Sequence, residues 1–149
     1  MLSTPATSKL YNQDFAQWLD QTVQLLKEGK LDELDLENLI EEVESLGRSE
    51  KRALSSNLII VILHLLKWRY QPEKRSGSWK GSIIEHRRRV KRLLKDSPSL
   101  KSYLESEFTD CYANARLQAA GETGLDIQAF PVDCPYGLEA LLTDGFLPD

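Results

Sequence analysis

One apolar pattern constrains this chain more than any other feature of its sequence. From residue 36 to residue 68, apolar and small residues recur in steps of three, four or seven, at Leu36, Ile40, Val43, Gly47, Leu54, Leu58, Val61, Leu65 and Trp68. That spacing keeps one face of an α-helix apolar. It predicts a single long helix over about 36–70, with Gly47 as the place where it would kink or split. Gln71-Pro72 ends it.

Three further helices follow from the same periodicity and from capping signals. Asp14 and Gly29 bound a helix over about 14–28. Ser78 is the predicted N-cap of a helix that ends near Lys95. Ser97 followed by Pro98 opens another, which stops at Gly121 or Gly124. No strand pattern is present, so short connections between amphipathic helices predict an all-α antiparallel bundle with a long second helix. Proline breaks between apolar anchors predict a C-terminal tail of short helical pieces that wraps the bundle.

Length and composition favour an ordinary globular protein. The 149 residues fit a single all-helical domain spanning 1–149, with residues 1–10 loosely ordered. The longest apolar run, 58–66, is interrupted by His64 and is about half the length that a bilayer requires, so neither a membrane span nor secretion is expected. Without an export signal, Cys111 and Cys134 are expected to be reduced thiols in the cytoplasm.

Charge is strongly segregated along the chain. Residues 1–50 carry 4 Lys/Arg and 11 Asp/Glu, residues 51–95 carry 13 and 2, and residues 96–149 carry 2 and 10. One interpretation is a cationic central hairpin whose field is compensated by acidic helices of the same domain. The other is a basic face for nucleic acid or an acidic partner.

The basic run HRRRVKRLLK, residues 86–95, is the strongest candidate for a macromolecular contact. Its apolar residues anchor it to the core, which leaves most of its cations facing outward. Aromatic residues flank the loop that precedes it, an arrangement that suits an interface or base stacking, although both tryptophans fall in core phase. The candidate contact residues are Trp68, Arg75, Trp79, Arg88, Arg89, Arg92 and Lys95.

A polar seam runs along the long helix. Glu50, Asn57, His64 and Gln71 stand at strict seven-residue intervals and therefore line up on one edge of the core face. Antiparallel pairing places His86 level with His64 and joins it to the seam. We favour a ladder of satisfied hydrogen bonds.

Antiparallel pairing of the next helix also brings Glu107 near the level of His64 and His86. Two imidazoles and a carboxylate could form an open metal site, which is a weaker alternative. No phosphate loop, nucleophile elbow or paired ExxH motif supports an enzyme. The sequence therefore favours a protein without catalytic residues or cofactor.

The chain also resembles a known family. The segments DLENLIEEVESLGRSEKR, HLLKWRYQPEKRSGSWKGSIIEHRRRV, LLKDSPSL, AAGETGLDIQAFPVDCPYGLEALL and the ending DGFLPD, in that order, are similar to the bacterial family called domain of unknown function twenty-nine. The resemblance extends from about Tyr11 to Pro148. It implies an all-helical fold and no assigned activity, so it transfers no catalytic residue to this chain.

Together these patterns predict a non-enzymatic cytoplasmic helical protein that binds another protein. Nucleic-acid binding through residues 86–95 is the first alternative, and a metal-dependent or hydrolytic activity near His64 and His86 is the second. The sequence leaves a homo-oligomer open.

Overall fold

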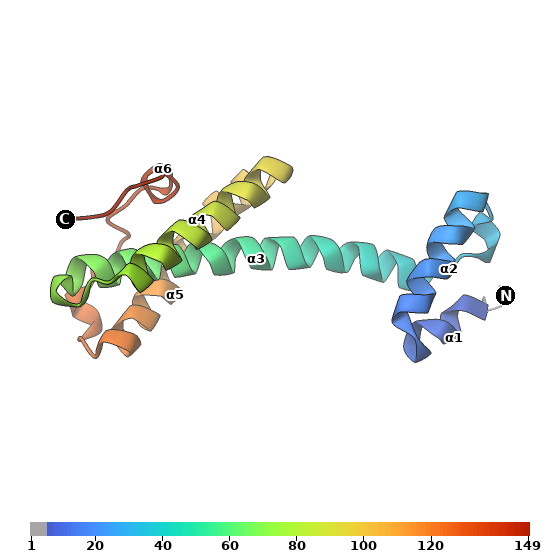
Figure 1. Cartoon of the computed structure of the whole chain (residues 1–149), viewed down its shortest axis with the longest axis horizontal. Coiled ribbons are helices and arrows are strands. Elements are labelled where there is room, and N and C mark those ends of the chain that lie inside the picture. Colours follow the sequence, from blue (N-terminus) through green and yellow to red (C-terminus); the bar gives the residue numbers. More distant parts are fainter. Residues whose placement is uncertain (1–5) are drawn as a thin grey trace. The chain divides into compact units, whose positions relative to one another are not determined.

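The computed structural model describes residues 6–149 and is all-helical over that range, without a strand. The chain divides into two compact units, residues 1–49 and 50–149, here called the N-terminal and C-terminal units. Both include part of the long helix α3, Leu36–Tyr70 (Figure 1). The predicted all-α class is confirmed. Among the described helices, none is long and apolar enough to cross a membrane.

The first described element of the N-terminal unit is a helix that the sequence did not predict, and residues 1–5 lie outside the described range. Helix α1, Ala6–Gln13, precedes α2, Phe15–Glu28, and covers part of the segment expected to be loosely ordered. Asp14 caps α2 as predicted, because its side chain accepts a hydrogen bond from the Gln17 backbone N–H. Gly29 closes α2 in the left-handed conformation, at φ 72°. A 3-10 turn, η1, Leu31–Glu33, then leads into α3.

Trp18 is the centre of this small unit. It is fully buried and donates from Nε1 to the carboxylate of Asp35, at 3.3 Å. Asp35 also accepts from the side-chain amide of Asn38 at 2.7 Å, so one carboxylate joins α2 to the first turn of α3. Tyr11 contacts the Trp18 ring edge-on and donates its hydroxyl proton to Glu42.

Helix α3 passes through Gly47 without interruption. Most of its buried side chains lie in the apolar stretch 58–66, as the all-round hydrophobicity of that stretch predicts. Seven of its side chains are buried, namely Leu54, Leu58, Val61, Ile62, Leu63, Leu65 and Leu66. A second 3-10 turn, η2, Pro72–Lys74, ends the run.

Helix α4, Gly77–Asp96, runs back along α3 (Figure 1). Ser97 Oγ donates to Glu50 near one end, and Lys67 Nζ lies 4.8 Å from the Trp79 ring centroid near the other. The predicted antiparallel hairpin is therefore confirmed. Its cap was predicted wrongly: Ser76 accepts from the Trp79 N–H, whereas Ser78 lies inside the first turn.

Helix α5, Leu100–Thr123, runs alongside α3 in the same direction. Cys111 faces Ser55 near one end, and Lys67 pairs with Glu122 at 3.0 Å near the other. The predicted start at Ser97-Pro98 is wrong, because those residues form a turn in which Ser97 O accepts from the Leu100 N–H. Gly124 ends the helix at φ 74°.

The C-terminal tail packs on the core as short helical pieces, as predicted. These are a 3-10 turn, η3, Ile127–Ala129, and α6, Leu138–Leu141. Phe130 and Leu141 are buried in the core cluster. Buried polar side chains hold the tail: Tyr112 donates to Pro131 O at 2.6 Å, and Arg87 donates to Leu141 O at 2.7 Å.

Candidate functional site

The most unusual surface belongs to the N-terminal unit, where large apolar side chains are exposed along α2. Phe15, Leu19, Val23 and Leu26 follow one another in steps of four, four and three, so they form one stripe on the helix. Trp18 and Thr22 are buried on the neighbouring stripe. The unit therefore buries one stripe of α2 and leaves the neighbouring apolar stripe exposed to solvent.

The first part of α3 repeats this arrangement. Leu36, Ile40, Val43 and Leu46 are spaced by four, three and three residues and are all exposed. Glu37, Glu41 and Glu44 lie beside that stripe and are also exposed. The apolar stripe of α3 is therefore bordered by a row of exposed carboxylates.

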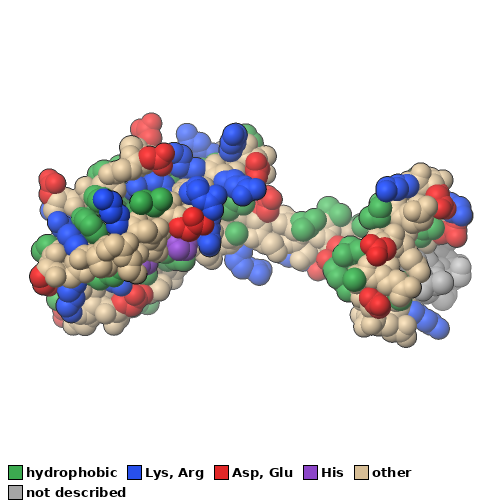
Figure 2. All heavy atoms as spheres, in the orientation of Figure 1, with side chains coloured by type: hydrophobic (Ala, Val, Ile, Leu, Met, Phe, Trp, Pro, Cys, Tyr) green, Lys and Arg blue, Asp and Glu red, His purple; other side chains and the backbone are tan. Residues whose placement is uncertain are grey.

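These two stripes and Leu31 contain most of the large hydrophobic side chains that the described residues expose. They hold nine of the twelve strongly exposed large hydrophobic side chains in that part of the chain, with exposed fractions from 41% at Leu19 to 68% at Leu46. Against this, the described residues of the unit, from 9 onward, bury only two hydrophobic side chains, Trp18 and Leu34. Figure 2 shows the hydrophobic side chains in green on the surface of this unit, at the right of the view. We call the stripes of α2 and α3, with Leu31, the apolar face.

The basic helix presents its cations to solvent. Arg88, Arg89, Arg92 and Lys95 are exposed and Val90 is buried. With Asn57 and Asp96, the three arginines line an open hollow of about 320 Å³. The hollow is positive, but its wall includes a carboxylate.

Glu85 reduces the free charge of this helix. Its carboxylate accepts two hydrogen bonds from Arg88, at 3.1 and 2.8 Å, and one from Arg89 at 2.9 Å. These guanidinium bonds lower the pKa of Glu85 to about 2. Two of the four outward cations are therefore partly neutralised within their own helix.

The aromatic candidates serve the packing of the α3–α4 connection. Arg75 lies over the Trp68 ring, 5.1 Å from its centroid, and donates from Nε to Trp68 O at 2.7 Å. Lys67 lies over Trp79 while it pairs with Glu122. Each ring is half-buried and has one face taken by a cation of this chain, which leaves less of the ring available for base stacking.

Each residue of the polar seam along α3 has a hydrogen-bond partner. Asn57 donates to Ala53 O at 2.7 Å, and His64 Nδ1 bonds Ile60 O at 2.9 Å. Gln71 donates to Thr123 O at 3.5 Å, and Glu50 accepts from Ser97. These bonds fit a structural ladder better than an open site.

The two histidines do not share a ligand. His86 Nδ1 bonds Ser82 O at 2.8 Å, within its own helix, as His64 does with Ile60. Glu107 is not placed with them, and the described residues contain no group of three His, Cys, Asp or Glu that could hold a metal ion. Burial lowers the pKa of His64, which favours the neutral imidazole.

Neither cysteine is suited to nucleophilic chemistry. Both Cys111 and Cys134 are free thiols. Burial raises the pKa of each thiol, so little of the reactive thiolate is present at neutral pH.

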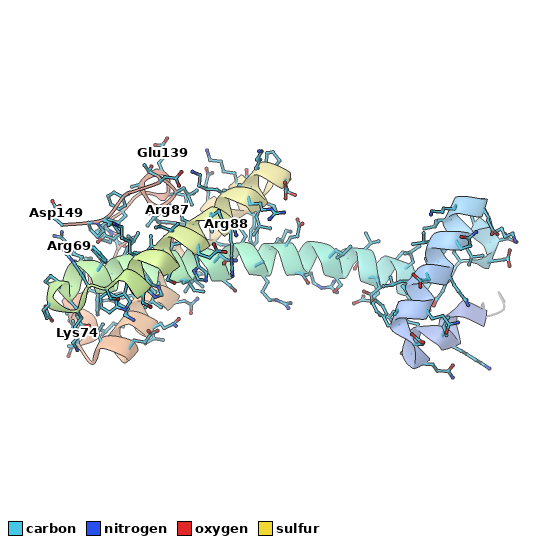
Figure 3. All side chains as sticks on the ribbon, in the orientation of Figure 1. Arg69, Lys74, Arg87, Arg88, Glu139 and Asp149 are labelled. Carbon is cyan, nitrogen blue, oxygen red and sulfur yellow. The ribbon has the colours of Figure 1, made fainter. Side chains whose placement is uncertain are left out.

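Sequence reasoning missed Arg87 and the exposure of the apolar face. Arg87 is 2% exposed and donates to Leu141 O and, at 3.1 Å, to Phe146 O. Figure 3 shows it between α4 and the tail that carries α6, whereas Arg88 points elsewhere. The signal was its spacing: Arg87 lies four residues after Ile83 and three before Val90, both core positions.

Comparison with known proteins identifies one family. The sequence profile described as "Domain of unknown function DUF29" matches residues 10–147. No curated protein and no solved structure matches the chain.

Proposed function

Since the chain belongs to a family defined only as a domain of unknown function, DUF29, we propose its function from its own surface: it binds another protein through the apolar face of the N-terminal unit. The observation that carries this proposal is the concentration of exposed apolar side chains there. A soluble monomer rarely exposes contiguous apolar patches of this kind, and those it does expose mark interaction sites.

The energetics of the unit support the same function. A segment of fewer than about 50 residues that buries so few hydrophobic side chains gains little from its own core. Covering Leu19, Ile40 and Val43 with a partner would supply the missing burial, at roughly 25 cal/mol per Å² of apolar surface. Binding would therefore stabilise the unit as well as join two proteins.

Nucleic-acid binding through α4 is the second candidate, and the hollow beside Arg88 and Arg92 favours it. It is weaker, because Glu85 pairs with two of the outward cations and each nearby tryptophan already has a cation of this chain over its ring. Phosphate binding requires cations that are free to replace the counterions of the nucleic acid.

Co-purification from the native host separates the two candidates. Three tagged proteins are compared: the parent, an Ile40→Gln/Val43→Gln variant and an Arg88→Gln/Arg92→Gln variant. Glutamine is neutral and favourable in a helix, so the first pair removes apolar surface without changing charge. We expect a protein that co-purifies after nuclease treatment and is lost only from the Ile40→Gln/Val43→Gln variant.

Nucleic acid that co-purifies with the parent, disappears on nuclease treatment and is lost from the arginine variant would instead establish the second candidate. Retention of the same protein by all three chains would show that it binds elsewhere, and the proposal would fail.

A further inference from the structure

The apolar face also carries information about the chemistry of its partner. We propose that it binds a basic amphipathic helix, with apolar residues at helical spacing flanked by Lys or Arg. This inference rests on the proposed function, since it specifies what occupies the same surface.

The shape of the face favours a helix. Both stripes present side chains three or four residues apart along a helix axis: Phe15, Leu19 and Val23 on α2, and Leu36, Ile40 and Val43 on α3. Rows of this spacing are the ridges that interdigitate when helices pack. The matching partner is an amphipathic helix that inserts anchors at positions i, i+3, i+4 and i+7.

The charge of the unit favours a basic helix. Residues 1–49 carry 4 Lys/Arg and 10 Asp/Glu. Glu37, Glu41 and Glu44 form an exposed row beside the α3 stripe, and Arg48 pairs with two of them, Glu41 at 2.8 Å and Glu44 at 3.7 Å. The excess of carboxylates over cations leaves a negative rim, which attracts cations at the edge of a partner.

The same charge argues against the N-terminal unit of a second copy as the occupant. Two such units would bring two negative rims together, and like charges across an interface disfavour the pairing. Lys or Arg beside apolar anchors relieves this repulsion and adds attraction at the rim. The face therefore selects a partner of opposite charge.

Synthetic peptides test this directly with the full-length chain. The test peptide is an 18-residue helix of Leu and Lys with Leu at i, i+3, i+4 and i+7. A Leu/Glu peptide of the same pattern is the control for charge. A scrambled Leu/Lys peptide keeps composition but loses the apolar stripe. Binding is measured by fluorescence anisotropy at low salt and at about 0.5 M salt, where surface charges are screened.

We expect the patterned Leu/Lys peptide to bind at least about tenfold more tightly than either control. High salt and the Glu37→Gln/Glu44→Gln variant should each weaken it by roughly threefold to tenfold. Glu73→Gln/Glu105→Gln, which removes two exposed carboxylates of the C-terminal unit, should leave the affinity unchanged. Ile40→Gln/Val43→Gln should abolish binding.

The outcomes separate this inference from the proposed function. Equal binding of the Leu/Lys and Leu/Glu peptides, lost in Ile40→Gln/Val43→Gln, would overturn the basic partner and leave an apolar protein-binding face. Equal binding of the patterned and scrambled peptides would reduce the interaction to charge alone and overturn the helix. Sedimentation showing a dimer that dissociates on Ile40→Gln/Val43→Gln would make a second copy the occupant and overturn the inference.

Discussion

At the scale of single residues, the structure separates positions that support the fold from positions that are free to change. Gly47 and Gly124 show the difference clearly. Of these two, only Gly124 has a positive φ, of 74°. Gly47 lies within the continuous helix α3, and no atom lies within 4 Å of where its Cβ would sit.

Replacing Gly47 with alanine should therefore stabilise α3 by about 1 kcal/mol, because alanine loses less backbone entropy in a helix. Gly124→Ala should destabilise the protein by about 1 kcal/mol, because alanine is strained in the left-handed conformation. Thermal unfolding followed by circular dichroism measures both. A lower melting temperature for Gly47→Ala would show that the glycine has a role beyond the helix.

His64 gives the second prediction at this scale. Its pKa is lowered from the ordinary 6.5 by burial, so the unfolded chain binds a proton more readily than the folded one. Stability is therefore complete above about pH 6.5 and falls as the pH drops below that value. Urea unfolding between about pH 7.5 and pH 5.5 should show a smaller loss in His64→Gln than in the parent, and parallel curves would contradict this account.

At the scale of elements, α4 has two structural roles: one of its arginines holds the C-terminal tail, and the others face solvent. Four consecutive residues, His86, Arg87, Arg88 and Arg89, are all basic or titratable, yet one of the arginines is buried and holds the tail. The helical period determines which arginine is buried, because only Arg87 shares a face with Ile83 and Val90.

Replacing Arg87 with methionine should cost about 2–3 kcal/mol, since it removes charged hydrogen bonds to two carbonyls and leaves them unpaired. Hydrogen exchange should show faster exchange over residues 138–147. Arg88→Met, one position along and exposed, should change stability by less than about 0.5 kcal/mol. Equal effects of the two substitutions would refute the role of Arg87 as the anchor of the tail.

The sequence predicted most element bounds because apolar period and chain-breaking residues are local signals. Gly29 and Gly124 ended helices as expected, and α3 ran to Tyr70 before Pro72. The cap of α4 was misplaced by two residues because Ser76 and Ser78 both suit an N-cap, and only the backbone geometry distinguishes them.

The candidate site was harder to predict, for a physical reason. Periodicity shows which face of a helix is apolar, but it does not show whether another element covers that face. Leu36, Ile40 and Val43 were placed on the apolar face of the long helix, and the structure exposes them. Conversely, the density of charge at residues 86–95 drew attention to cations that Glu85 partly neutralises.

At the scale of the whole molecule, the two units differ in the size of their hydrophobic cores. The cluster that includes Leu58, Ile83 and Leu104 belongs to the C-terminal unit, while the N-terminal unit depends on Trp18 and its bond to Asp35. The single domain over residues 1–149 that the sequence predicts stays a prediction. On our account the N-terminal unit gains its full stability only when a partner covers its apolar face.

Cross-linking in the native host tests that central claim most directly. A photoreactive phenylalanine replaces Val43, on the apolar stripe, or Glu105, exposed on α5 of the C-terminal unit. We predict an adduct with one other protein from position 43 and at most a trace from position 105. Adducts of equal yield from both positions, or adducts at position 43 with this chain alone, would contradict the account.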